Sequence, residues 1–270
     1  MRRTRELKVK LVRSNLVKYE LRNLAGNIFV LLFGLIFPIF MSIFLGSLIG
    51  GQVPEESRDT VVTSIFISNS IIIPLATVFI GYSATFSQEL EKNIPLRFRL
   101  FGYNEKTLVA SKISAYLIFM TIALSLYTVV AGLSLKILVP SFSSAIILIG
   151  SLYLLSIILF ILSHGISLLI KKFGPTYVIT MILYFGIMIL SGMFGVQAKD
   201  FPEPLMRVAY IFPTTYIAGE FIDFWQTGSY NFMPYIQSLL LFTAVSVIIL
   251  FIAINKDSRY NHREKVSVSK

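Results

Sequence analysis

Residues 27–50 read NIFVLLFGLIFPIFMSIFLGSLIG, and no charged side chain interrupts this stretch. A helix needs about 20 apolar residues to cross the roughly 30 Å hydrocarbon layer of a bilayer, so the stretch predicts a membrane-spanning helix. Five further apolar runs cover 61–86, 108–135, 142–170, 175–198 and 233–255. We therefore expect an all-α membrane protein with six transmembrane helices.

The composition points to the same class. Of the 270 residues, 55% are hydrophobic and 14% are charged, and the mean hydropathy is +0.76. These values exclude a water-soluble globule. No remaining segment is long enough for a soluble catalytic domain. Polar residues precede the first run, so we expect it to stay as an anchor and not to be removed as a signal peptide.

Basic residues are distributed unevenly along the chain. If both termini lie in the cytoplasm, all but four of the 24 Lys and Arg residues fall on the cytoplasmic side; the exceptions are Arg58, Lys136, Lys199 and Arg207. Such a bias sets the orientation of membrane proteins. It predicts a multi-pass protein of a bacterial plasma membrane with both termini cytoplasmic, and it explains the net charge of +10 better than nucleic-acid binding does.

Both ends of the chain are predicted to be cytoplasmic. Residues 1–26 predict an interfacial helix, because four apolar residues share one helical face: Val9, Val12, Leu16 and Tyr19. A solvated basic tail is the alternative. Residues 256–270 form a polar C-terminal tail.

The loop 87–107, SQELEKNIPLRFRLFGYNEKT, joins the second and third runs. Pro95 suits the first turn of a helix and Gly102 suits its end, so we expect a short helix around Leu96–Phe101. Two turns are not stable alone in water, and this helix must dock on a surface. We expect Phe98 and Phe101 to share a face that enters an apolar cleft of a partner, with Arg97 and Arg99 at its rim.

The segment 199–232 is rich in aromatic residues, including the only tryptophan, Trp225. Pro202, Pro204 and Pro213 interrupt it, so it cannot span the bilayer. We expect two short helices, broken at Pro213, that dip into the outer leaflet.

Small and polar residues mark particular faces of the predicted spans. Ser42, Gly46 and Gly50 are spaced by four, and this spacing lets another helix approach closely. Span two is the most polar span, and a buried amide such as Asn69 needs a partner or a cavity. We expect a substrate path past five residues of spans one and two: Phe37, Phe40, Ser64, Ser68 and Asn69.

Several kinds of chemistry have no support in the sequence. The chain has no cysteine, which excludes thiolate catalysis and Cys-based metal sites. It has no Gly-Lys pair for a phosphate-binding loop, and we expect no charged coupling site within the spans. His164 is interpreted as a packing residue, with a proton relay as the alternative. A His164–Ser191 hydrolase dyad lacks the expected flanking motif.

A signature in the C-terminal half resembles that of the ABC-2 type permease family. It consists of Ser191-Gly192-Met193-Phe194, Pro202 and Pro213-Thr214-Thr215-Tyr216. The resemblance implies paired re-entrant helices in 199–232 and a coupling helix that sits in a cleft of a separate ATPase subunit, which binds ATP and magnesium. Asn93-Ile94 departs from the family pattern, which often has Gly-Thr there.

The resemblance also suggests roles for individual residues. Contact with the ATPase is expected from the loop residues Glu89, Glu91, Pro95, Leu96, Arg97, Phe98, Arg99 and Phe101. Spans one and five commonly meet at the dimer axis in this family, so contact with a second permease copy or a paralogue is expected from Ser42, Gly46, Gly50, Ser191 and Gly195.

The sequence therefore predicts a transport subunit without enzymatic activity of its own. It would export a hydrophobic or amphipathic substrate such as a drug, a peptide or a lipid-like molecule. Export of a polysaccharide by the same kind of permease, an ion-coupled transporter and a channel remain the alternatives.

Overall fold

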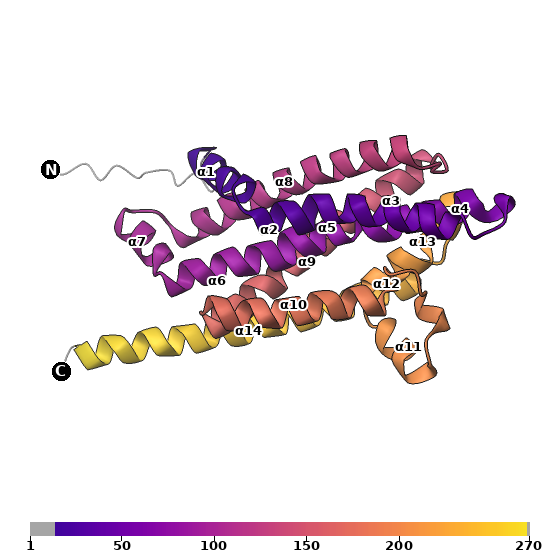
Figure 1. The fold of residues 1–270 in the computed structure, drawn as a ribbon. Coiled ribbons are helices and arrows are strands. Elements are labelled where there is room, and N and C mark those ends of the chain that lie inside the picture. The colour runs from indigo at the N-terminus through magenta and orange to yellow at the C-terminus, as the bar shows by residue number, and fades with distance from the viewer. Residues whose placement is uncertain (1–13, 269–270) are drawn as a thin grey trace.

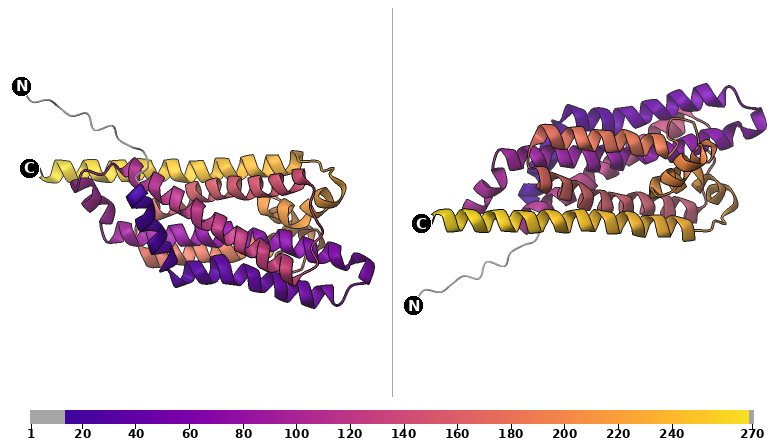
Figure 2. Two further views of the ribbon diagram at one scale, coloured as in Figure 1. Left: turned by 90° about the horizontal axis from the view of Figure 1, so that it is seen from above. Right: turned by 90° about the horizontal axis from the view of Figure 1, so that it is seen from below.

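The computed structural model describes residues 14–268, which contain helices and no strand. Six segments in this range are long and apolar enough to cross a membrane: Leu32–Gly50, Glu55–Glu91, Glu105–Ser134, Phe142–Ile170, Phe173–Leu190 and Met233–Asp257. They lie side by side in one bundle (Figures 1 and 2). The predicted all-α fold with six spans is confirmed.

Helix α1 (Ser14–Ala25) crosses one end of the bundle and packs on α8 (Glu105–Ser134) (Figure 1). Its buried face consists of Leu16, Glu20 and Leu24. The predicted stripe is wrong at Tyr19, which is exposed, because the buried face is turned toward Glu20. Val9 and Val12 lie outside the described residues.

Spans one and two each contain a wide π-helical segment next to a proline. Span one is continuous through α2 (Ile28–Leu31), η1 (Leu32–Ile36) and α3 (Phe37–Gly50), and Pro38 follows its π segment. Span two runs through α4 (Glu55–Ser70), α5 (Ile72–Pro74), η2 (Leu75–Tyr82) and α6 (Ser83–Glu91). Proline has no backbone N–H, so the regular hydrogen-bond ladder is disturbed at both places.

Span two is the centre of the bundle. In its most apolar stretch 83% of residues are buried, against 50% or less in each of the other five spans. The rest of the bundle is formed by α8, α9 (Phe142–Ile170), α10 (Phe173–Leu190) and α14 (Met233–Val268). Helices α3, α9 and α10 pack on span two, and α14 packs on α9.

The two ends of the bundle differ. Helix α1, the short helix α7 (Ile94–Leu100) and the C-terminal end of α14 lie at one end, which we call the α7 end (Figure 1). The opposite end holds η3 (Ala198–Asp200), α11 (Glu203–Ala209), α12 (Pro213–Gly219) and α13 (Phe221–Thr227). We call it the α11–α13 end.

The segment 199–232 differs from its prediction. It forms three short helices instead of two, and Pro213 begins α12 instead of breaking a helix. Helix α12 is buried between α4 and α14. Beside it, Tyr230 donates a hydrogen bond of 2.6 Å to the Glu220 carboxylate, and burial raises the pKa of the Tyr230 hydroxyl above its usual value.

Two span ends also differ from the predicted boundaries. Helix α10 stops at Leu190, although the fifth apolar run extends to 198, because Gly192 has a φ of +78°. A side chain there would meet the Val196 carbonyl at 2.8 Å. Helix α14 continues past residue 255 to Val268, because the polar sequence after the apolar run contains neither Gly nor Pro.

The small-residue ladder of span one packs inside this chain. The Ser42 hydroxyl lies 3.1 Å from the Tyr127 hydroxyl and forms a hydrogen bond with it. A Cβ atom on Gly46 would meet Leu135 at 3.0 Å, and one on Gly50 would meet Val62 at 2.9 Å. The ladder that is predicted to contact a second subunit is thus covered by α4, α8 and Leu135 of its own chain.

We expect Gly46→Val to destabilise the folded chain by about 1–3 kcal/mol, because the added methyl groups crowd Leu135. Gly132→Val is the matched control, since nothing lies within 4 Å of a Cβ atom built there. Thermal unfolding of both variants in detergent measures the difference. If Gly46→Val unfolds like the wild type but loses self-association, the ladder does lie between subunits.

Candidate functional site

Helix α7 links span two to span three at the α7 end. It begins after Asn93, whose φ of 54° turns the chain, and Pro95 is its second residue. The helix covers Ile94–Leu100, one to two residues earlier than predicted. Asn104 then caps the start of α8 by accepting a hydrogen bond from the Lys106 N–H at 3.0 Å.

The C-terminal end of α7 is a Schellman motif. Gly102 has a φ of +81°, its N–H donates to the Arg99 carbonyl, and the Tyr103 N–H donates to the Phe98 carbonyl, both at 3.0 Å. The Phe98 and Tyr103 rings pack edge to face with centroids 5.6 Å apart. This hydrophobic contact commonly accompanies the motif and fixes the direction of the exit loop.

Phe98 and Phe101 therefore do not share a free face, and that prediction is wrong. Phe98 is half-buried against Tyr103, whereas Phe101 is 80% exposed. Leu96 and Leu100, four residues apart on α7, are 52% and 81% exposed. We call Leu96, Leu100 and Phe101 the α7 apolar patch. Since α7 projects beyond the spans, this patch lies outside the bundle (Figure 1).

The charged residues predicted for partner contact divide into two groups. Arg97 is exposed, and Arg99 forms an exposed ion pair of 2.8 Å with Glu105. Glu91 accepts a hydrogen bond of 2.9 Å from the Phe173 N–H and so caps the first turn of α10. Glu89 is directed into the chain, toward Lys112. The structure thus uses both glutamates for contacts within this protein.

A buried cluster of three charges joins α1, α6 and α8. The Lys112 ammonium donates to Glu89 at 2.6 Å and to Glu20 at 2.8 Å. All three side chains are at most 13% exposed. The two carboxylates compensate the ammonium charge, and the ammonium is the shared partner that allows both carboxylates to be buried. We call Glu20, Glu89 and Lys112 the charge triad.

The triad corrects the prediction that the spans hold no charge. Lys112 lies within the third apolar run, 108–135, near its cytoplasmic end. Its position inside an apolar run was the available signal, since such a residue normally pairs with another charge. Its partners could not be identified, because they come from segments 92 and 23 residues away.

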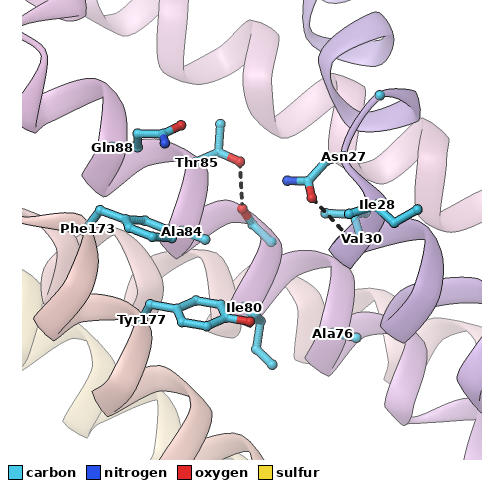
Figure 3. Close-up of a pocket in the computed structure, with 12 residues that line it drawn as sticks. Asn27, Ile28, Val30, Ala76, Ile80, Ala84, Thr85, Gln88, Phe173 and Tyr177 are labelled. Atoms are coloured by element: carbon cyan, nitrogen blue, oxygen red, sulfur yellow. Dashed lines mark hydrogen bonds between the residues drawn. The ribbon is translucent and has the colours of Figure 1, made fainter.

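A pocket of about 320 Å³ opens near the α7 end, between spans one, two and five (Figure 3). Phe173 and Tyr177 of α10 line one side with stacked rings, and Asn27 lies on the other. Thr85 and Gln88 of α6 lie between them. Its remaining lining is uncharged, so the pocket combines apolar and aromatic surface with neutral hydrogen-bonding groups. We call it the inner pocket.

A second pocket, of about 150 Å³, lies near the α11–α13 end. Span one and α4 form one side, and the loop after α10 together with α12 and α13 forms the other. Its lining includes Gly192, Met193 and Gly195 of the loop that follows α10. We call it the outer pocket.

The predicted substrate path is only partly assembled. Ser64 and Ser68 line the outer pocket. Asn69 is fully buried and lines neither pocket, and its amide makes no hydrogen bond with the described groups. Phe37 is half-buried, whereas Phe40 points outward and stacks on Phe44 with centroids 5.6 Å apart.

Of the two predicted packing residues at the end of span five, Ser191 is buried and Gly195 is exposed. The Ser191 hydroxyl lies 2.6 Å from that of Thr214. Gly195 has a φ of +95°, and a Cβ atom there would meet Ile49 at 3.0 Å. Both residues therefore hold the outer loop against this chain's own elements.

His164 and Ser191 are not brought together. His164 accepts or donates a 2.7 Å hydrogen bond with the Tyr82 hydroxyl and stacks on Phe86, toward the α7 end. Ser191 follows the last residue of α10, at the α11–α13 end of the bundle. These contacts give no support for a hydrolase dyad. Within the described residues, no group of three His, Asp or Glu side chains could hold a metal ion.

Comparison with known proteins places the chain in a family. The ABC-2 type transporter family model matches residues 14–219. The matched range begins at α1 and includes the first five spans, α7 and the outer helices α11 and α12. It therefore contains the residues of span two that line both pockets. A comparison with curated proteins gives no match. Since the family model covers more than half of the 270 residues, this chain belongs to the ABC-2 type transporter family.

Proposed function

We propose that this chain is the permease subunit of an exporter that is driven by a separate ATPase subunit. The observation that carries the proposal is the α7 apolar patch, which lies outside the bundle on a helix attached directly to the central span. The chain has no Gly-Lys pair of a phosphate-binding loop. ATP and magnesium would therefore bind to the partner, and this chain would transmit the resulting motion.

The α7 end is proposed to face the cytoplasm of a bacterial cell. Helix α1, α7 and the C-terminal end of α14 lie together at this end, as an even number of spans requires (Figure 1). The sequence stretches 1–26, 87–107 and 256–270, which contain these elements, hold 17 of the 24 Lys and Arg residues. Because basic residues accumulate on the cytoplasmic side of membrane proteins, both termini are assigned to the cytoplasm and the chain to the plasma membrane.

The ATPase is proposed to bind the α7 apolar patch. Three large apolar side chains exposed on one short helix are costly in water and gain free energy when a partner covers them. Arg97, exposed on the same helix, would guide the approach of an acidic rim on the ATPase more than it would add affinity.

Three polar contacts would carry movement of α7 into the bundle. The charge triad joins the end of α6 to α1 and to α8. The hydrogen bond from the Phe173 N–H to Glu91 joins the same end to α10. A displacement of α7 therefore acts at once on the inner ends of spans two, three and five and on α1.

The substrate is proposed to be hydrophobic or amphipathic and to move along span two. The inner and outer pockets lie near the two ends of this span. Span one lines both pockets, whereas α10 of span five lines the inner pocket and the loop after α10 lines the outer pocket. Their linings are apolar, aromatic or neutral polar, which suits a drug, a peptide or a lipid-like molecule. The ring pair Phe173–Tyr177 is the one feature that favours a polysaccharide, since sugars commonly stack on aromatic rings.

A second permease copy or a paralogue is proposed to complete the transport path. The small-residue ladder is covered, so the second copy would contact the apolar face of span one that remains exposed: Leu32, Ile36, Phe40, Phe44 and Leu48. Lipid would cover the other exposed apolar residues of the spans.

Replacing the α7 apolar patch by alanine, as Leu96→Ala, Leu100→Ala and Phe101→Ala together, should weaken ATPase binding at least tenfold and abolish transport. The six spans should still insert, because insertion depends on the length and apolar composition of the spans themselves. Co-purification of the ATPase and transport in vesicles measure these effects. Leu133→Ala with Phe142→Ala is the control, because these side chains are 85% and 83% exposed at the other end of the bundle. Wild-type ATPase binding by the triple variant would contradict the assignment.

Lys112→Met should lower the free energy of unfolding by about 3–5 kcal/mol, because it leaves two buried carboxylates without a partner. Thermal unfolding measures this loss, with Lys106→Met on the exposed first turn of α8 as the control. Adding Glu20→Gln and Glu89→Gln to Lys112→Met should recover most of it. Equal melting temperatures for Lys112→Met and Lys106→Met would show that the triad is not a structural link.

Single cysteines test the orientation directly, because the natural chain has none. In intact cells, an impermeant thiol reagent should label Ser57→Cys in the first turn of α4. It should not label Arg97→Cys on α7. Both residues are exposed. Permeabilised cells provide the control, since both should then react. The opposite labelling pattern in intact cells would reverse the proposed orientation.

A further inference from the structure

The outer pocket is lined by a row of hydroxyl groups from one helix. Thr60, Ser64 and Ser68 are spaced by four on α4, and all three line this pocket. Thr60 lies at its exposed side, where it accepts a 2.6 Å hydrogen bond from the Gln226 amide. Ser64 and Ser68 follow deeper along the helix.

Ser68 differs from the other buried hydroxyls of span two. Its side-chain oxygen makes no hydrogen bond with any described group, although the residue is only 7% exposed. Thr63, Thr77 and Ser83 instead donate to the carbonyl four residues earlier, each at 2.6 Å. A buried hydroxyl without a partner costs about 1–3 kcal/mol. The Ser68 oxygen is itself enclosed in this structure, so a molecule in the pocket would reach it after a change of the Ser68 side-chain rotamer, whereas Ser64 is only half-buried and lines the pocket directly.

The opposite wall is built from the loop that follows α10. Gly192 and Gly195 line the pocket and have no side chains, so the loop presents backbone there, and Gln197 also lines the pocket. The remaining lining is aliphatic, from span one, α4, α12 and α13, with Met193 from the loop. The pocket thus offers hydroxyl groups on one wall and an amide on the other, within a lining that is otherwise mostly aliphatic.

No charged side chain lines this pocket. Arg58, three residues before the lining residue Val61, does not line the pocket; it donates to the Gly50 carbonyl at 2.9 Å and lies 3.9 Å from the exposed Glu55 carboxylate. A charged group in the pocket would lose hydration and find no opposite charge, which is costly. A neutral hydroxyl or amide would find both donors and acceptors, since a serine hydroxyl can act as either.

We propose that the outer pocket binds the uncharged, hydroxyl- or amide-bearing head of an amphipathic substrate and discriminates against charged heads. The inference rests on the proposed export function and names the substrate class for it. The volume of about 150 Å³ accommodates a small head and not a whole amphiphile, so the apolar chain extends out of the pocket toward the membrane.

Binding can be measured with the full-length chain in phosphatidylcholine nanodiscs, without the ATPase. Trp225, the only tryptophan, lies on α13 one turn beyond Ile222, which lines the pocket. Its fluorescence should be quenched by a 12-carbon chain that carries bromine when the head of that amphiphile occupies the pocket. The probes are brominated monolauroylglycerol, with a neutral head, and brominated laurate and lauryltrimethylammonium, with charged heads.

We expect the neutral probe to quench at a membrane concentration at least tenfold lower than either charged probe. Ser64→Ala with Ser68→Ala should abolish this difference. Ser70→Ala is the matched control, because it removes a buried hydroxyl from the same helix that bonds to the Ile67 carbonyl and does not line the pocket. The melting temperatures of both variants show whether the fold is retained.

Two results would overturn the proposal. Equal quenching by charged and neutral probes would exclude head selection, and unchanged selectivity in the double serine variant would mean that the hydroxyl row is merely hydrated. The experiment is independent of the coupling assignment. If the chain selects neutral heads but binds no ATPase, the proposed export function fails and the pocket assignment stands. If the chain binds the ATPase but does not select neutral heads, only the pocket assignment is rejected.

Discussion

Span two is buried along most of its length, and its backbone must find all its hydrogen-bond partners inside the protein because lipid offers none. Pro74 and the π segment Leu75–Tyr82 leave its regular ladder incomplete. Side chains of neighbouring spans bond to its carbonyls. Tyr127 of α8 donates to Phe66 at 2.7 Å, and Tyr116 donates to Gly81 at 3.1 Å. These contacts hold the bundle around one helix.

The same helix connects the membrane bundle to α7. Its last turn carries Glu89 and Glu91, and each is bound to another element: Glu89 to Lys112 of α8, and Glu91 to the first turn of α10. Breaking the Glu89–Lys112 pair would leave a buried charge without compensation, and Glu91 adds an exposed hydrogen bond to the backbone of α10. The inner ends of spans two, three and five therefore resist separate movement, whereas the α7 apolar patch remains free for a partner.

Hydropathy was sufficient to predict the six spans, because crossing a bilayer imposes a length and an apolar composition on every helix. Local turn chemistry was sufficient for α7, since Pro95, Gly102 and Asn104 act within a few residues of their own positions. The direction of the side chains could not be predicted. Phe98 is held by Tyr103, a contact that exists only once the loop closes into its Schellman motif.

Contacts between distant segments were also beyond the sequence. A row of small residues permits a close approach but does not identify the helix that approaches, and Ser42, Gly46 and Gly50 meet elements of their own chain. The charge triad needed the positions of three separate helices. The unpartnered Ser68 hydroxyl is likewise visible only in the structure, because other hydroxyls on the same helix bond to their own backbone.

Distances between spin labels at the α7 end test this linkage most directly. One variant would carry labels at Arg22→Cys on α1 and Arg97→Cys on α7, and a second at Arg97→Cys and Lys256→Cys on α14. Each would be mixed with an excess of unlabelled chain and assembled with the ATPase, so that only distances within one chain are measured. If the charge triad unites α1, α6 and α8, binding of ATP and magnesium should change the Arg97–Lys256 distance and leave the Arg22–Arg97 distance constant. A change in the Arg22–Arg97 distance, or no change in either, would contradict a rigid coupling unit driven through α7.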